Sequence, residues 1–133
     1  MTLNIRVITP DRIICSTTAD EIILPSLTGQ IGNLEGHASL ITALDVGLLR
    51  IKFEQKWTPI ILLGGFAEVD RNQVTVLVND VEEAPTIKLT NTAEELEKAF
   101  AAIENAETSK DKFEAAQNLK IASARVQALT FLA

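Results

Sequence analysis

Several residue types that build disulfides, metal sites and active sites are scarce in this sequence of 133 residues. It contains one cysteine, Cys15, one histidine, His37, and no tyrosine. A lone cysteine excludes an internal disulfide and a cysteine-based zinc site, and one histidine cannot build a histidine cluster. We therefore expect no metal and no other cofactor.

Positive charge is also scarce. Twelve lysines and arginines stand against 18 acidic residues, which gives a net charge of −6. Binding to nucleic acid needs clustered cations and, for single strands, exposed aromatic rings, whereas the chain has five phenylalanines and one tryptophan. The composition therefore argues against a nucleic-acid partner.

Long hydrophobic runs are absent as well. The longest apolar run, residues 59–66, suits a buried strand and is far shorter than the roughly 18 residues that a membrane span requires. Residues 1–6 have the features of neither a secretory signal nor a transit peptide. We expect a chain that works in the compartment where it is made, or a mature form.

Up to about residue 84, the sequence has the pattern of short strands. Leu3, Ile5 and Val7 alternate with polar residues at the period of a half-buried strand. Short apolar segments then follow one another, separated by turn-forming residues, which predicts a β-sandwich or barrel. The Gly64-Gly65 pair predicts a bulge or a close approach of two backbones. The expected strands cover residues 3–7, 13–15, 22–24, 30–34, 40–44, 48–53, 58–63, 66–69 and 74–78.

From residue 86 onward there is no proline or glycine, and alanine becomes the commonest residue, which predicts helices. Residues 92–95 have the pattern of a capping box, and apolar residues follow at helical spacing up to residue 103. After a polar turn at 105–112, a second helix is expected over 111–129. We therefore divide the chain into a β domain, residues 1–85, and an antiparallel helical hairpin, residues 86–133. The second helix should present one apolar stripe: Phe113, Ala116, Leu119, Ala122, Val126 and Leu129.

The hairpin has an alanine-rich seam. Small residues let helices approach closely but bury little area, and helices this short are marginal in water on their own, so the hairpin must dock on another surface. A weakly held hairpin suits a detachable switch, which needs a gap of only a few kcal/mol. A permanently packed appendage fits the sequence equally well.

Candidate catalytic groups are few. His37 has no second catalytic group near it in the sequence, so a turn or interface histidine is the simpler interpretation. Cys15 follows two isoleucines and has the setting of a small buried residue. Gly29 and Gly32 lack the lysine and the following helix of a phosphate-binding loop, which favours a hairpin turn or bulge. We do not expect an enzyme.

Residues 29–38, 40–43, 64–69 and 74–78, in this order, closely resemble the epsilon subunit of F-type ATP synthase. The opening segment, residues 2–10, and residues 21–25 are similar to the chloroplast and cyanobacterial branch of that family. The resemblance covers the whole chain, including the change from strands to helices.

This resemblance implies an α+β protein in two parts, a flattened antiparallel β-sandwich of about ten strands and a C-terminal helical hairpin. It implies a non-catalytic rotor subunit of the central stalk, placed between the gamma subunit and the c-ring, that couples proton flow to ATP synthesis. The hairpin would lie folded beside the β domain or extend along gamma into the catalytic alpha/beta head, where it impedes ATP hydrolysis.

The resemblance also implies where partners bind. Lys120 and Arg125 resemble basic positions that meet acidic residues of the catalytic beta subunits. The segment facing gamma is implied to contain His37, Ala38, Leu40 and Thr42. The surface facing the c-ring is implied to comprise Ser26, Leu27, Thr28, Gly29, Gln30, Ile31 and Gly32.

The sequence departs from the family pattern at several positions. Gln30 stands where many bacterial relatives have an acidic residue, and Ser39 where relatives often have proline. The ATP-binding motif of some bacterial relatives would begin at Ile87-Lys88 and lacks its aspartate, and Ile121 replaces a partner arginine. Nucleotide sensing is thus a weaker alternative.

Three alternatives to an inhibitory rotor subunit stay open at this point. They are an ATP-sensing regulator, a structural clamp whose hairpin never moves, and a small β-sandwich enzyme that uses His37 as its base. The expected location is the surface of a thylakoid membrane, reached only through the complex, on the stromal side of a chloroplast or the cytoplasmic side in a cyanobacterium.

Overall fold

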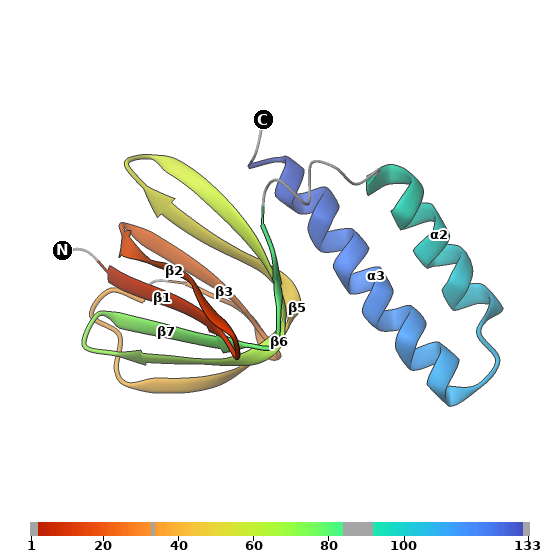
Figure 1. Ribbon diagram of the computed structural model, residues 1–133, viewed down its shortest axis with the longest axis horizontal. Coiled ribbons are helices and arrows are strands. Elements are labelled where there is room, and N and C mark those ends of the chain that lie inside the picture. The colour runs from red at the N-terminus through yellow and green to blue at the C-terminus, as the bar shows by residue number, and fades with distance from the viewer. Residues whose placement is uncertain (1–2, 33, 84–91, 132–133) are drawn as a thin grey trace.

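In the computed structural model, which describes residues 3–32, 34–83 and 92–131, eight strands form one hydrogen-bonded sheet that folds over on itself (Figure 1). The strand order is β2-β1-β7-β6-β5-β3-β4, and β8 pairs with β6. A helical hairpin lies at one side, so the expected α+β organisation is confirmed. The strands are β1 (Leu3–Thr9), β2 (Arg12–Ala19), β3 (Glu21–Ser26), β4 (Gly29–Ile31), β5 (Leu40–Phe53), β6 (Lys56–Asp70), β7 (Gln73–Val78) and β8 (Val81–Glu82).

The core of the β domain lies between the two layers of the sandwich. Leu3, Ile5 and Val7 of β1 are at most 1% exposed, while the alternate residues Asn4 and Arg6 are exposed. Every fully buried member of this cluster belongs to residues 3–81. The β domain therefore has a hydrophobic core of its own, to which no described residue of the hairpin contributes a buried side chain.

The described residues form eight strands, where about ten were expected, and two of these strands, β5 and β6, continue through predicted breaks. β5 runs through Gly47, where a Cβ atom would come within 2.9 Å of the Pro25 Cβ. β6 runs through Gly64 and Gly65. At Gly65 the φ angle is +150°, and a Cβ atom would lie 2.1 Å from the Leu77 carbonyl oxygen. These glycines permit bends and close backbone approach, as predicted for Gly64-Gly65, and do not end the strands.

One strand pair departs from the expected antiparallel pattern. β1 pairs with β7 in parallel, with Ile5 opposite Val74 and Val7 opposite Val76, while the other pairs are antiparallel. Hairpin turns fix the direction of strands that follow one another. β1 and β7 are far apart in the sequence, so no turn constrains them to be antiparallel.

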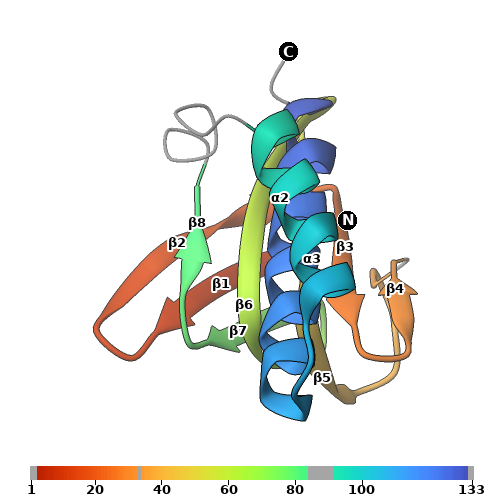
Figure 2. The same cartoon turned by 90° about the vertical axis from the view of Figure 1, so that its right-hand side faces the viewer.

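The hairpin consists of α2 (Thr92–Asn105) and α3 (Ser109–Leu129). α3 begins two residues before the expected start, because the Thr108 hydroxyl accepts a hydrogen bond from the Asp111 amide at 3.1 Å and caps the helix. α3 packs against β5 and β6, and α2 packs on α3, so the elements form successive layers (Figure 2). The predicted boundary at residue 85 lies outside the described residues.

The predicted apolar stripe of α3 is wrong. Of its six residues only Ala122 is buried, whereas Phe113 is 64% exposed. Small side chains allow α3 to lie close to the sheet and to α2, and bulky residues would hold these elements apart. On α2, Ala99 is likewise buried while Phe100 and Ile103 are exposed. The buried residues of α3 are Ala115, Ala122, Ala124 and Ala128.

Candidate interaction surfaces

Two ion pairs join α3 to the β domain. Lys120 Nζ lies 3.0 Å from Asp45 Oδ1 of β5, at a site that solvent reaches. The Arg125 guanidinium donates two hydrogen bonds of 3.0 Å, one to each carboxylate oxygen of Glu82 in β8. The two cations predicted to meet the catalytic head are therefore engaged by the chain's own acidic residues in this docked state.

The two pairs differ in strength. The side chains of Arg125 and Glu82 are 22% and 12% exposed, and their bidentate geometry is the favourable one for a guanidinium and a carboxylate. Charge-assisted hydrogen bonds of this kind contribute about 1.5–3 kcal/mol. Lys120 and Asp45 are 43% and 31% exposed, and such a pair contributes about 0–1 kcal/mol. Arg125 with Glu82 is thus the stronger of the two.

A small apolar cluster completes the contact. It is separate from the sandwich core and has four buried members, Leu48 and Ile61 from the sheet and Ala124 and Ala128 from α3. Each buried alanine contributes much less apolar area than a leucine would. The hairpin is therefore held by an apolar contact of small buried area, together with the two ion pairs.

The C-terminal end of α3 is fixed by an aromatic contact. The ring of Phe131 meets Trp57 edge-on, with ring centroids 6.1 Å apart, and the Arg50 guanidinium lies 5.5 Å from the Phe131 centroid. Gln30 and Gln127 line one cavity of about 310 Å³ with Arg50 and Phe131. The end of α3 thus shares a cavity with Gln30 of β4.

The segment predicted to face the c-ring, residues 26–32, forms the β3–β4 hairpin. Its tip, Leu27 to Gln30, is exposed, and the φ angle of Gly29 is +120°, so this segment is a turn. Ser26 is buried, and its hydroxyl lies 2.8 Å from the Thr42 hydroxyl. Ile31 and Gly32 are half-buried. The tip can contact a partner, while Ser26 positions it.

Of the four residues predicted to face gamma, two are exposed and two are half-buried. His37 and Ala38 are exposed, and the His37 Nδ1–H donates to the Ala38 carbonyl oxygen at 2.7 Å. Asn72 Oδ1 accepts from the Gly36 amide at 2.7 Å, which holds the segment beside the β6–β7 turn. Leu40 packs against the sandwich core, and the Thr42 hydroxyl points to Ser26. Of the four predicted residues, His37 and Ala38 are therefore the accessible ones.

Sequence reasoning missed an apolar surface on the outside of the sheet. Phe66, Leu77 and Leu27 are 60%, 50% and 63% exposed. Strand register places Phe66 opposite both Ala43 and Leu77, and Ile8 opposite both Leu77 and Ile13. The Leu27 amide donates to the Ala43 carbonyl at 3.1 Å. The outer apolar row, as we call it, consists of Leu27, Ala43, Phe66, Leu77, Ile8 and Ile13.

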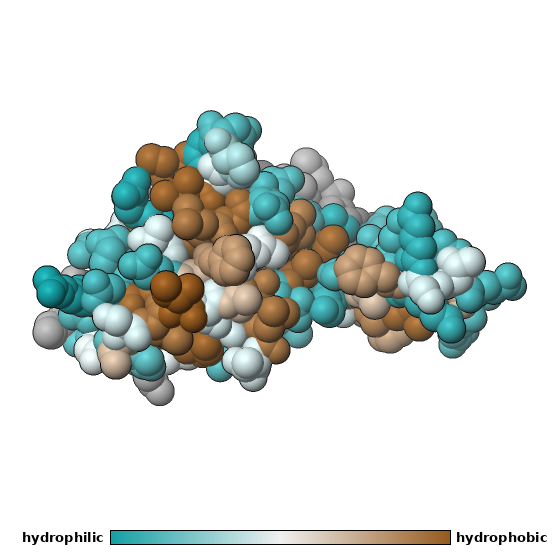
Figure 3. Space-filling model, turned by 90° about the horizontal axis from the view of Figure 1, so that it is seen from below, coloured by the Kyte–Doolittle hydropathy of each residue, from teal (hydrophilic) through white to brown (hydrophobic). Residues whose placement is uncertain are grey.

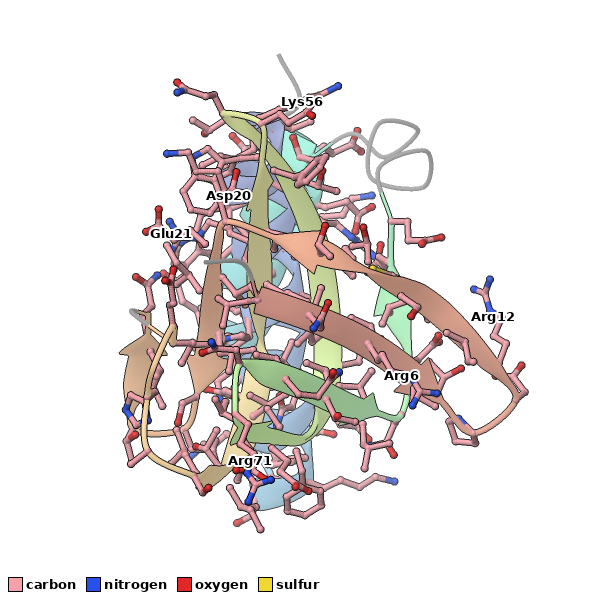
Figure 4. All side chains as sticks on the ribbon, turned by 90° about the vertical axis from the view of Figure 1, so that its left-hand side faces the viewer. Arg6, Arg12, Asp20, Glu21, Lys56 and Arg71 are labelled. Carbon is pink, nitrogen blue, oxygen red and sulfur yellow. The ribbon has the colours of Figure 1, made fainter. Side chains whose placement is uncertain are left out.

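The outer apolar row borders a groove of about 700 Å³ between β1, β5, β6 and β7. Figure 3 shows apolar side chains gathered over the β domain, in contrast to the mostly hydrophilic hairpin. Arg6 and Arg71 lie on the β domain away from the hairpin, Arg6 on β1 and Arg71 at the β6–β7 turn (Figure 4). Several large exposed apolar side chains gathered on one face of a sheet are typical of a protein–protein interface.

Cys15 lines a second cavity, of about 480 Å³, between β2, β5 and β6. The side chain is half-buried and packs against the sandwich core, which agrees with the predicted structural role. Burial, followed by the nearby charge of Glu83, raises the pKa of the Cys15 thiol. A raised thiol pKa disfavours the thiolate, the reactive form.

Among the described residues, no three His, Cys, Asp or Glu side chains are grouped so that they could hold a metal ion. Within the same residues, no helix has the length and apolarity to cross a membrane. The surfaces described above, a sheet face, a turn and a docked helical hairpin, define a small interaction module in which the hairpin is the less firmly held part.

Comparison with known proteins identifies the family. The β-sandwich domain of the ATP synthase delta/epsilon chain matches residues 2–84. The chloroplastic ATP synthase epsilon chain of Thalassiosira pseudonana is 65% identical over 132 residues, which is 99% of each chain. That of Porphyra purpurea is 54% identical over 130 residues, or 98% of this chain and 97% of the relative. The chain belongs to the ATP synthase epsilon family, in its plastid branch, and is a non-catalytic subunit.

Solved structures support the fold. A chain of the Euglena gracilis mitochondrial ATP synthase, in a structure of its OSCP, F1 and c-ring, superposes with a TM-score of 0.79 at 21% identity, covering 96% of this chain and 81% of that one. A chain of the Tetrahymena thermophila central stalk and c-ring gives 0.65 at 15% identity and covers 96% of both. The two-part architecture is therefore shared across distant sequences.

Proposed function

We propose that the chain is a rotor subunit of a plastid ATP synthase, in which the β domain joins gamma to the c-ring and the hairpin restrains ATP hydrolysis. Its place is the stromal side of the thylakoid membrane, reached through the complex alone. Support comes from the chloroplastic relatives and from the central stalk and c-ring named for the Tetrahymena structure. The proposal that the hairpin restrains hydrolysis rests on one observation: α3 is docked by a small apolar cluster and two ion pairs.

The gamma-binding surface is proposed to be the outer apolar row apart from Leu27, together with His37 and Ala38. The row offers exposed side chains such as Phe66 and Leu77 on a rigid sheet. The segment that carries His37 is tied to the β6–β7 turn through Asn72, at the end of the strands that carry the row. Arg6 and Arg71 favour a partner with acidic side chains at its margin.

The c-ring contact is proposed to be the tip of the β3–β4 turn, Leu27 to Gln30. This tip is uncharged, with one large apolar side chain at 63% exposure and the amide of Gln30 beside it. Such a tip fits the polar loops of a c-ring through hydrogen bonds rather than ion pairs. The inward-facing Ser26 and Thr42 hold the turn and contribute no contact of their own.

The restraint on ATP hydrolysis is proposed to require release of the hairpin. When docked, α3 engages Lys120 and Arg125 with Asp45 and Glu82. A hairpin that leaves the sheet frees both cations for acidic residues of the catalytic beta subunits. The buried residues of α3 are all alanines, so the helix itself exposes little apolar area when it leaves the sheet.

One experiment tests this function. ATP hydrolysis is measured with a catalytic head stripped of its epsilon subunit, after adding back the full chain or residues 1–85. The β domain has its own core, so the truncated chain should fold and bind. We expect the full chain to slow hydrolysis and the truncated chain to bind without slowing it. If both bind and neither inhibits, the chain is a static clamp.

An ATP-sensing role is the second candidate, and equilibrium dialysis with millimolar ATP tests it. The start of the nucleotide motif, Ile87-Lys88, lies outside the described residues. Arg125, the remaining arginine of that pattern, is held by Glu82. We expect no bound ATP.

A further inference from the structure

The structure assigns a second role to Asp45 and Glu82. We propose that these two carboxylates act as decoys for the cations of α3, so that the docked hairpin and the hairpin bound to the catalytic head compete for the same two positive charges. This inference rests on the proposed function, in which Lys120 and Arg125 bind acidic residues of the head. Asp45 and Glu82 are named the decoy carboxylates below.

Position supports the inference. Asp45 lies in the middle of β5 and Glu82 lies at the end of the β domain in β8, and both face α3. Lys120 and Arg125 are five residues apart on that helix. Two separate strands thus each place one carboxylate opposite one of the two cations of α3. The face of the β domain that meets this helix is therefore complementary to it in charge.

Among the described residues, Lys120 and Arg125 are the cations of α3 that form ion pairs with the sheet. A further ion pair of the hairpin, Lys98 with Glu94, is internal to α2. The Nε and Nη2 groups of Arg125 are both bonded to Glu82, so this edge of the guanidinium cannot bind a second carboxylate while the hairpin is docked. Docking also places Lys120 against Asp45, so a carboxylate of the head has to compete with Asp45 for it.

The charges of the decoy carboxylates can be removed while their hydrogen-bond acceptors are kept. Asp45 Oδ1 also accepts from the Val46 amide at 2.8 Å, and asparagine keeps an oxygen acceptor at this place. Glutamine at position 82 keeps one acceptor for Arg125. Asp45→Asn with Glu82→Gln should therefore leave the β domain folded while weakening its hold on α3.

The matched control is Asp11→Asn with Glu54→Gln. It makes the same two chemical changes at exposed turns of the β domain, where no contact with the hairpin is found in the described part of the chain. A third variant, Lys120→Gln with Arg125→Gln, removes the cations themselves. All three full-length variants are compared with the unaltered chain.

The first readout is amide hydrogen exchange of α3 in the free chain. Loss of the decoy carboxylates should speed exchange of α3 by roughly fivefold to thirtyfold, the factor that one or two kcal/mol of lost docking gives. Exchange in β1 and β7 should not change. Exchange of α3 at the rate of the control variant would overturn the decoy role, whether or not the chain inhibits anything.

The second readout is inhibition of ATP hydrolysis by the stripped catalytic head. The decoy variant keeps both cations, so it should inhibit at a lower concentration than the unaltered chain. The cation variant loosens docking equally but should inhibit less. Weaker inhibition by both variants would overturn the competition. If no chain inhibits, the proposed function fails, while the exchange measurement still decides whether the carboxylates hold the hairpin.

Discussion

Gly65 sets the bend of β6, and its neighbours leave no room for a side chain. Its φ angle of +150° is strained for any other residue, and a Cβ atom would lie 2.1 Å from the Leu77 carbonyl oxygen and 2.7 Å from the Val78 Cα. Both obstacles are backbone atoms, which cannot rotate away. The bend lets β6 pair with β8 at one end and with β7 at the other.

Gly65→Ala should therefore lower the free energy of unfolding by roughly 3 kcal/mol or more, from backbone strain together with the collision. Gly29→Ala is the control, since its φ angle of +120° is strained but an added Cβ atom would meet no neighbouring heavy atom within 4 Å. It should cost about 1–2 kcal/mol. Urea denaturation measures both, and equal losses would show that the close approach to β7 is unimportant.

Cys15 provides a second test at this scale. Burial and, less strongly, the charge of Glu83 raise the pKa of its thiol. A raised pKa means that the thiol keeps its proton to higher pH, so the pH at which alkylation becomes fast should lie above that of the urea-unfolded chain. Glu83→Gln should move this pH downward. Identical pH profiles for the folded and unfolded chains would contradict the assignment.

The sequence predicts that the C-terminal part forms two helices, but it does not predict which side of α3 is buried. The loss of glycine and proline after Pro85 predicts two helices, but it does not predict the cap at Thr108, so the expected start of α3, residue 111, is too late. Bulky residues such as Phe113 suggest the wrong buried side, because spacing alone does not tell which stripe will meet a closely packed neighbour. The partners of Lys120 and Arg125 are distant in the sequence, so no local sequence pattern predicts these ion pairs.

Phe131 links the end of the hairpin to Trp57, the single tryptophan, so fluorescence reports docking directly. Phe131→Ala removes the ring contact and the stacking of Arg50, and should weaken docking by about 1–2 kcal/mol. The emission of Trp57 should shift to longer wavelength as water reaches it. Phe113→Ala, at a side chain that is 64% exposed, is the control and should leave the spectrum unchanged.

At the scale of the whole molecule, the β domain is a rigid platform with partners proposed at two places. Alternation along β1 predicts its buried face correctly. β6 is different, because apolar residues fall on both of its faces, and the sequence does not show that Phe66 lies outside. Surfaces that bind partners share the apolar character of a core, which is why sequence reasoning overlooked the outer apolar row.

Phe66→Ala should weaken binding to gamma by about 2 kcal/mol, or roughly thirtyfold, as expected for a central interface residue. The stability of the free chain should change little, since the side chain is 60% exposed. Phe53→Ala is the control, because Phe53 is 45% exposed and lies outside the row. Titration calorimetry with gamma measures the affinity, and equal affinity of both variants would remove the row from the interface.

In the proposed function, the hairpin must leave the sheet before it can restrain the catalytic head. The ring centroids of Trp57 and Phe131 lie 6.1 Å apart, so cysteines at these two positions, in a Cys15→Ser chain, can be joined by a bismaleimide while the hairpin is docked. The measurement is ATP hydrolysis by the stripped head with this chain before and after crosslinking. We expect inhibition before crosslinking and its loss afterwards. Equal inhibition by the crosslinked chain would show that the hairpin restrains hydrolysis without leaving the sheet.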